Sequence, residues 1–425
     1  MKIRELNPSE KVKIITKEKE WEGMVLESYD PSVILLKLDS GYNIGILEKD
    51  ILDVLVLEKA KKTEKKKFIL KTDESLPNVA MIITGGTISS RLDPKTGGVI
   101  STDEEEILNI SSEIKNVCNI VKIEKPFLKW SENMSFSDFA KLAETAEKLL
   151  NDDSIKGLII THGTDFLHYS AAALSFFLGR LNKPVAFTYS QRSIDRASTD
   201  AALNLLCAAK FAVSDIAELS IIGHKNIEDD VCLAMPATKT RKLHASRRDA
   251  FKVINSEPFA EISEKEFRIL KGFNARTESG VKADAKYNDK VAVIKIYPGQ
   301  SPDILDYYAE KGYKGIILEV AGIGQVPGKD SSDNWLPKIK KSIEKGVVIC
   351  AAAQTIYGRL NPKVYENGRE LEKTGIIFLK DMLSETALVK LAWVLGHKEI
   401  AKDREKVREK MLENISNEFN ERLSV

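Results

Sequence analysis

The sequence lacks the features that would tie the chain to a membrane, to an oxidising compartment or, through bulk charge, to nucleic acid. No apolar run approaches the roughly 18 residues that a membrane-spanning helix needs. The first residues, MKIRELNPSEKVK, lack the apolar centre of a signal peptide. The formal net charge is only +1, which gives no electrostatic case for direct nucleic-acid binding. The four cysteines form no CxxC pair, so we expect reduced, buried thiols in a cytoplasmic protein: Cys118, Cys207, Cys232 and Cys350.

Motifs for metals and nucleotides are missing as well. The five histidines show neither an HExxH motif nor another paired-ligand spacing, which argues against a metal site. No GxxxxGKS or GxxxxGKT phosphate loop occurs, and the lone GxG at Gly322–Gly324 is a weak signal on its own. We therefore expect no cofactor in this chain.

The first 58 residues predict a small β-rich domain. Turn signals such as Asp-Ser-Gly separate the short runs, and five such strands predict a small SH3-like or OB-like β-barrel. Residues 59–76 are rich in lysine and predict a solvated linker; an RNA-binding patch is the weaker interpretation, because Phe68 is the only aromatic residue there. The expected strands are Lys11–Thr16, Trp21–Ser28, Val33–Leu38, Tyr42–Leu47 and Ile51–Leu57.

From Pro77 onward, apolar strands alternate with amphipathic helices, which predicts doubly wound parallel sheets. We expect an N-terminal α/β domain at 77–273, a polar linker at 274–290 and a C-terminal α/β domain at 291–425 that ends in a charged helical tail. The expected helices of the first domain lie near 103–109 and at Ser137–Leu150, Tyr169–Leu181 and Asp195–Phe211.

Two expected strands end in similar polar motifs. Val79–Ile83 leads into Thr-Gly-Gly-Thr, which ends at Thr87, and Gly157–Thr161 leads into His-Gly-Thr-Asp, which ends at Asp165. Glycines let the backbone approach a ligand closely, and ligands of open α/β sheets bind at the carboxyl ends of strands. A single Gly-Gly turn would be an ordinary connection, but the second motif favours a binding site.

These residues suit the hydrolysis of an amide. That reaction needs a nucleophile, a base to deprotonate it and hydrogen-bond donors for the developing oxyanion. The sequence offers two hydroxyls, Thr87 and Thr164, and the carboxylate of Asp165. A lysine serves as base only when burial or a neighbouring charge lowers its pKa. Lys239 and Lys242 compete for that role.

The ordered motifs TGGTI, THGTD and a lysine before Asp249-Ala-Phe251 resemble those of the L-asparaginase family of amidohydrolases, over about Pro77 to Gly396. The resemblance implies an asparaginase-like two-domain fold, favours Lys242 over Lys239 by its spacing to Phe251, and places oxyanion donors at backbone N–H groups near Gly86 and Thr164. It implies four catalytic residues: Thr87 as nucleophile, with Thr164, Asp165 and Lys242 as a relay. It also implies substrate contacts from Gly86, Ser131, Glu132 and Gly163.

One departure from the asparaginase pattern concerns the loop after TGGTI. Asparaginases usually carry a tyrosine in this mobile loop, whereas the sequence between Ile88 and Lys125 contains none. Either another hydroxyl substitutes for it or a partner completes the loop. Gly97 and Gly98 supply the hinge that such a loop needs.

The N-terminal barrel followed by this altered loop is similar to the GatD chains of archaeal glutamyl-tRNA(Gln) amidotransferases. That resemblance implies a glutaminase that supplies ammonia from glutamine to a GatE-type subunit. The partner would use ATP and Mg²⁺, contact the tRNA and convert Glu-tRNA(Gln) to Gln-tRNA(Gln). It further implies a homodimer within a heterotetramer. The alternatives are a stand-alone L-asparaginase and a non-catalytic scaffold whose barrel binds RNA or protein.

Overall fold

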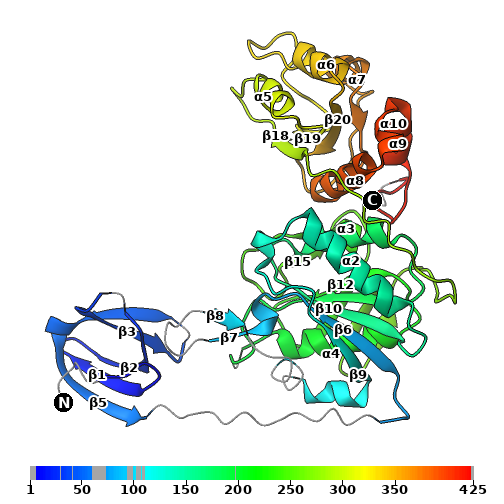
Figure 1. Ribbon diagram of the computed structural model, residues 1–425. Coiled ribbons are helices and arrows are strands. Elements are labelled where there is room, and N and C mark those ends of the chain that lie inside the picture. Colours follow the sequence, from blue (N-terminus) through cyan, green and yellow to red (C-terminus); the bar gives the residue numbers. More distant parts are fainter. Residues whose placement is uncertain are drawn as a thin grey trace.

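The computed structural model describes residues 6–28, 30–40, 42–59, 73–92, 99–101, 107, 111–196 and 198–422, which form three successive parts along the chain (Figure 1). Most of the helix expected near 103–109 and most of the linker expected at 59–76 lie outside the described residues. Within the described residues, no helix has both the length and the apolar character needed to cross a bilayer.

The first part is a five-stranded antiparallel sheet in the order β4-β3-β2-β1-β5, curled around a small core (Figure 1). Alternating inward residues build that core, including Val12, Ile14 and Leu36. Each strand lies within two residues of its predicted bounds, because turn residues separate them so clearly. The strands are β1 (Lys11–Thr16), β2 (Glu20–Leu26), β3 (Val33–Leu38), β4 (Asn43–Leu47) and β5 (Ile51–Glu58).

The second part contains an eight-stranded sheet in the order β17-β16-β13-β12-β11-β10-β6-β9. The five strands from β9 to β12 pair in parallel, as predicted, and the other three add an antiparallel edge that the sequence analysis did not predict. The strands are β6 (Asn78–Ile83), β9 (Asn119–Glu124), β10 (Gly157–Thr161), β11 (Val185–Thr188), β12 (Leu219–His224), β13 (Val231–Pro236), β16 (Ala260–Ser263) and β17 (Phe267–Ile269).

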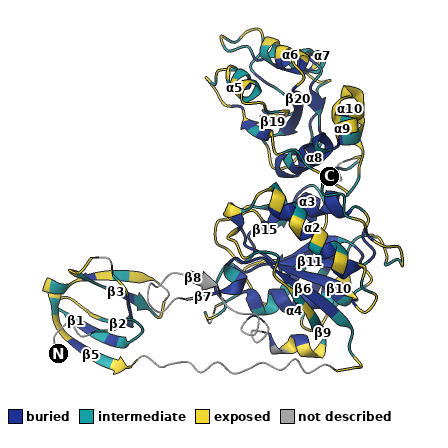
Figure 2. Ribbon diagram, in the orientation of Figure 1, coloured by how far each residue is buried: buried dark blue, intermediate teal, exposed yellow. Residues whose placement is uncertain are grey.

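Helices cover both faces of this sheet, which explains why its central strands read as continuous apolar runs. In β6, Ala80 and Ile82 pack into one core with α2 (Phe136–Leu150) and α3 (Leu167–Leu178). The alternate residues of the same strand pack into a second core, against α4 (Ala201–Val213). The central strands are accordingly buried along their length (Figure 2).

The third part is a parallel sheet in the order β18-β19-β20-β21, flanked by helices. Its helix α8 packs on α3, with the rings of Phe176 and Trp393 stacked 6.2 Å apart, so one apolar core runs through both α/β parts. The elements are β18 (Val291–Lys295), α5 (Ile304–Glu310), β19 (Gly315–Val320), α6 (Leu336–Glu344), β20 (Val348–Ala353), α7 (Glu366–Lys373), β21 (Ile377–Phe378), α8 (Ser384–Gly396), α9 (Lys398–Ala401) and α10 (Arg404–Leu412).

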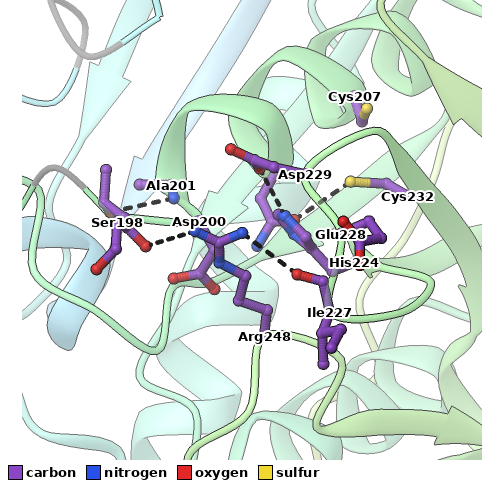
Figure 3. A network of polar contacts seen from close by, with 12 residues as sticks. Ser198, Asp200, Ala201, Cys207, His224, Ile227, Glu228, Asp229, Cys232 and Arg248 are labelled. Atoms are coloured by element: carbon purple, nitrogen blue, oxygen red, sulfur yellow. Dashed lines mark hydrogen bonds and ion pairs between the residues drawn. The ribbon is translucent and has the colours of Figure 1, made fainter.

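The helix predicted at Asp195–Phe211 is wrong at its start, because α4 begins at Ala201. The buried carboxylate of Asp200 accepts hydrogen bonds from the backbone N–H groups of Gln191 (3.0 Å) and Arg192 (3.1 Å), which folds the preceding residues into a loop. Arg248 holds the same loop from the other side by donating to the carbonyl of Ser198 at 2.9 Å (Figure 3). Side chains that bond nearby backbone compete with helix formation in this way.

Three other predicted helices end or begin elsewhere. The helix predicted at Tyr169–Leu181 stops at Leu178, because Gly179 takes a positive φ of 60°. The helix predicted from Ser137 starts one residue earlier, since Ser135 and Asp138 form a capping box. The charged tail is helical only through α10, and the next ten residues, 413–422, form no helix.

Residues 413–420, hereafter the tail strap, bind back onto the body of the protein. Glu418 is fully buried and accepts hydrogen bonds from Lys390 (2.5 Å) and from the backbone N–H of Ser416 (2.7 Å). Asn420 donates to both the backbone carbonyl of Asn255 (2.5 Å) and the carboxylate of Asp381 (2.9 Å). The strap therefore contacts both α/β parts.

We expect the variant Glu418→Gln to lower the free energy of unfolding by about 3–5 kcal/mol, because it leaves the Lys390 ammonium buried without a counter-charge. Denaturant unfolding of the purified chain measures this loss. The matched control is Glu370→Gln, which breaks a solvent-exposed pair with Lys373 and should cost less than about 1 kcal/mol. Equal losses in the two variants would contradict the assigned role of the tail strap.

Candidate active site

The site lies where β6 and β10 end side by side at the carboxyl edge of the large sheet. Their parallel register pairs Ile83 with Thr161, so the two polar motifs that follow emerge next to each other. They meet at Gly86 and Gly163: a Cβ placed on Gly86 would lie 2.3 Å from the Cα of Gly163. Gly86 also has a positive φ of 84°, so both its conformation and its surroundings require glycine.

Two serines fix the turn that presents Thr87. The hydroxyl of Ser89 donates to the carbonyl of Gly85 at 2.8 Å, and that of Ser90 donates to the carbonyl of Gly86 at 2.6 Å. Thr87 itself is half-buried and opens a short 3-10 turn that ends at Ser89. The sequence analysis missed both serines, although two hydroxyls directly after TGGTI were a signal for such a turn.

The structure brings Lys242, Thr164 and Asp165 together. The ammonium of Lys242 donates to Thr164 Oγ1 at 2.8 Å and to Asp165 Oδ1 at 2.7 Å. The Lys242 side chain is 10% exposed and that of Asp165 60%, so the cluster opens to solvent on the carboxylate side. Such a Lys–Thr contact provides a path for a proton between a hydroxyl and an amine.

Lys239 lies elsewhere. Its ammonium is 1% exposed and forms an ion pair with the fully buried carboxylate of Asp381 at 2.6 Å. It also donates to the backbone carbonyl of Asp381 at 3.2 Å. Of the two lysines that compete in the sequence, the geometry therefore brings Lys242 to the hydroxyl of Thr164 and places Lys239 at the contact between the two α/β parts.

Ser131 joins the cluster from the loop after β9. Its side chain is buried, and its Oγ accepts the backbone N–H groups of Asp165 (3.1 Å) and Phe166 (3.2 Å). The hydroxyl proton stays available to a ligand. Glu132, its neighbour, is exposed and forms no hydrogen bond or ion pair with any other residue that the structure describes.

Backbone donors face the same space. No acceptor among the described residues bonds the N–H groups of Gly86 or Thr164, although neighbouring amides such as Thr84 are paired. Free N–H groups at the ends of two adjacent strands can stabilise a developing oxyanion. The described residues include no cluster of three or more His, Cys, Asp or Glu side chains suited to a metal ion.

Two buried histidines lie behind the cluster. Burial lowers the pKa of His162 from 6.5 to about 4 and that of His168 from 6.5 to about 3. The nearby cations Arg241 and Lys242 lower the pKa of His168 further. Both imidazoles are therefore neutral near pH 7, and neither adds positive charge beside Lys242.

Three protein families match this chain in succession. Residues 6–71 match "GatD N-terminal domain", residues 78–273 match "Asparaginase, N-terminal" and residues 290–411 match "Glutaminase/Asparaginase C-terminal domain". The chain is 44% identical to the D subunit of glutamyl-tRNA(Gln) amidotransferase from Thermococcus kodakarensis, covering 94% of this chain and 90% of that one. It is 42% identical to the corresponding chain of Pyrococcus abyssi, covering 99% and 96%.

The chain belongs to the GatD family of glutamyl-tRNA(Gln) amidotransferases.

Solved structures confirm the asparaginase-like fold of this GatD family member. The thermostable L-asparaginase from Thermococcus kodakarensis superposes with a TM-score of 0.71 at 26% identity, covering 81% of this chain and 99% of that one. L-asparaginase I from Vibrio cholerae gives a TM-score of 0.69 at 25% identity, with the same coverage. Asparaginases of this kind match four fifths of the chain, and the match to the GatD N-terminal domain lies over the first sheet.

We expect the variant Gly86→Ala to abolish amide hydrolysis, because its methyl group would collide with the Gly163 backbone and separate the two motifs. Ammonia release from glutamine measures this loss. Gly346→Ala is the matched control: Gly346 has a similar positive φ of 89° but nothing within 4 Å of the added Cβ. Full activity in both variants would contradict the assigned packing of the two motifs.

Acid should destabilise the fold through His162. Because its pKa is about 4 in the folded chain, the unfolded chain binds the proton first as the pH falls below 6.5. The free energy of unfolding then falls by up to about 1.4 kcal/mol per pH unit, down to the folded-state pKa. We expect His162→Gln to show a shallower slope over this window in denaturant titrations at several pH values; an unchanged slope would refute this assignment.

Proposed function

We propose that this chain is the glutaminase of a tRNA-dependent amidotransferase: it releases ammonia from glutamine for the conversion of Glu-tRNA(Gln) to Gln-tRNA(Gln). The observation that carries the proposal is the contact of Lys242 with Thr164 and Asp165 beside the Gly86–Gly163 crossing. The near full-length relationship to other GatD chains supports it.

In the mechanism that this geometry favours, the Thr87 hydroxyl attacks the carboxamide carbon of glutamine. The relay of Lys242 and Thr164 accepts the hydroxyl proton and returns a proton to the departing nitrogen, so ammonia leaves and an ester to Thr87 remains. Water then cleaves the ester, which yields glutamate and restores the hydroxyl. Backbone N–H groups of Gly86 and Thr164 stabilise the oxyanion in both steps.

Substrate binding falls to the rim of the same site. The free hydroxyl proton of Ser131 is a donor for the substrate carboxylate, while the carboxylates of Asp165 and Glu132 can pair with the substrate ammonium. Asp165 would then contact both Lys242 and the substrate, which couples correct binding to the position of the base.

The second half of the reaction belongs to a partner. Activating the glutamyl carboxylate needs ATP and Mg²⁺, which we expect in a GatE-type subunit that also makes most of the tRNA contacts. We propose a homodimer of this chain within a heterotetramer, acting in the cytoplasm as part of protein synthesis. The relatives are named as one lettered component of their enzyme, which implies at least one further component.

A stand-alone L-asparaginase is the second candidate, and the fold alone would allow it. The match to the GatD N-terminal domain over residues 6–71 favours the amidotransferase. The absence of a loop tyrosine between Ile88 and Lys125 points in the same direction, since an incomplete loop suits a site that another subunit completes.

We expect Thr87→Ala, assayed in complex with the partner subunit, to reduce glutamine-dependent formation of Gln-tRNA(Gln) by at least about a thousandfold. Amidation driven by added ammonium chloride should stay normal, because that reaction needs only the partner's site. The conservative variant Thr87→Ser should retain part of the glutamine-dependent activity. Glutamine-dependent amidation by Thr87→Ala at the parent rate would sink the proposal.

The isolated chain separates the two candidate functions. An ammonia-supplying subunit should hydrolyse free glutamine and asparagine slowly until the partner and Glu-tRNA(Gln) are added. Fast hydrolysis of asparagine without a partner, measured as ammonia release, would instead favour the stand-alone asparaginase.

A further inference from the structure

The segment that carries Lys242 is held by the C-terminal α/β part. It consists of a 3-10 turn, Ala237–Lys239, followed by the short strand β14, Thr240–Lys242. The residues that it contacts are 381–386, hereafter the α8 entry segment, which includes the first turn of α8. Lys242 itself points away from this contact, toward Thr164 and Asp165.

Three contacts join the two segments in sequence. The Thr386 hydroxyl donates to the backbone carbonyl of Thr238 at 2.9 Å. The ammonium of Lys239 pairs with Asp381 at 2.6 Å. Next along the chain, Arg241 Nε pairs with Glu385 Oε1 at 2.9 Å. The last contact thus comes immediately before the active-site lysine.

Glu385 is held firmly in place. Its side chain is 8% exposed, and its second carboxylate oxygen lies 3.3 Å from the hydroxyl of Ser384. The same hydroxyl donates to Glu319, on β19, at 2.6 Å. Burial raises the pKa of Glu385, while the Arg241 cation opposes that rise. The carboxylate is therefore fixed to both the helix and the sheet of the C-terminal part.

Strand β14 has little else to fix it. It is three residues long and pairs with a single strand, β15 (Phe251–Val253). Successive side chains of a strand point to opposite faces. Arg241 therefore reaches the C-terminal part, while Lys242 reaches the N-terminal part. Both bonds of Lys242 have ordinary lengths, and a shift of about 1 Å in β14 would break them.

We propose that the Arg241–Glu385 ion pair positions Lys242, so that the C-terminal α/β part sets the geometry of a site whose other residues lie on the N-terminal part. This inference rests on the proposed function. It makes Arg241, Ser384 and Glu385 positioning residues, which act through Lys242 and touch no reacting atom.

The neighbouring pair, Lys239–Asp381, has a different part in this arrangement. It is fully buried, so its loss should mainly destabilise the contact between the two parts. Arg241 is 28% exposed, and a partly solvated pair adds little stability. Loss of Arg241–Glu385 should therefore appear in the catalytic rate more than in the melting temperature.

The test is Glu385→Gln in the full chain assembled with its partner subunit. We expect kcat for glutamine hydrolysis to fall about tenfold to a hundredfold, with KM within about twofold of the parent value. The matched control is Asp284→Asn, which removes the ion pair with His397 (2.7 Å) at the opposite end of α8. That variant should keep the parent kcat.

Two further measurements separate positioning from a general loss of structure. A crystal structure of Glu385→Gln should show the Lys242 Nζ to Thr164 Oγ1 distance lengthened beyond about 3.5 Å, the limit of a hydrogen bond. The double variant Arg241→Met, Glu385→Gln should be no slower than the slower single variant, because both changes remove one interaction. If Glu385→Gln does not fold, Arg241→Met alone provides the same kcat measurement.

Failure of this inference differs from failure of the proposed function. If Lys242→Ala and Thr87→Ala abolish glutamine hydrolysis but Glu385→Gln and Arg241→Met keep the parent kcat, the positioning role is refuted and the proposed function stands. Equal losses in Asp284→Asn and Glu385→Gln would also refute it, since the effect would then belong to α8 as a whole. If Lys242→Ala remains active, the proposed function itself fails.

Discussion

The parallel pairing of β6 with β10 is the constraint on which the site depends. With Ile83 opposite Thr161, two glycine-containing turns emerge at the same level, and they can lie in contact only because neither Gly86 nor Gly163 carries a side chain. The pairing also sets the height at which Ser131 and Lys242 must arrive from other segments. Both faces of the strands are buried, so a change of this register would expose apolar side chains.

Charged groups buried between the two α/β parts supply the second constraint. The pairs of Lys239 with Asp381 and of Lys390 with Glu418 are both almost inaccessible to solvent. Such pairs add little net stability compared with apolar packing, but a displaced partner leaves an uncompensated charge. They therefore disfavour other arrangements of the two parts, and a site built across the contact inherits that definition.

Sequence patterns predicted the fold class, the N-terminal strands and the central parallel strands, because short apolar runs bounded by turn residues have few alternatives. They did not predict the antiparallel edge strands or the start of α4, where the side chain of Asp200 bonds backbone that lies close by only after folding. At the site, motif spacing predicted the neighbourhood of Thr164, Asp165 and Lys242. The role of Arg241 was hidden, since Glu385 lies far away along the chain.

The tail strap has a consequence for how the protein is made on the ribosome. Glu418 and Asn420 join both α/β parts, yet residues 413–420 are synthesised after every strand of the three sheets. Each sheet can fold as it emerges, since domains form as units during synthesis. The Lys390 ammonium, however, has no counter-charge until the strap leaves the exit tunnel. Nascent chains should therefore hold two folded but unlocked halves until that moment, and chaperones would meet the protein at this stage.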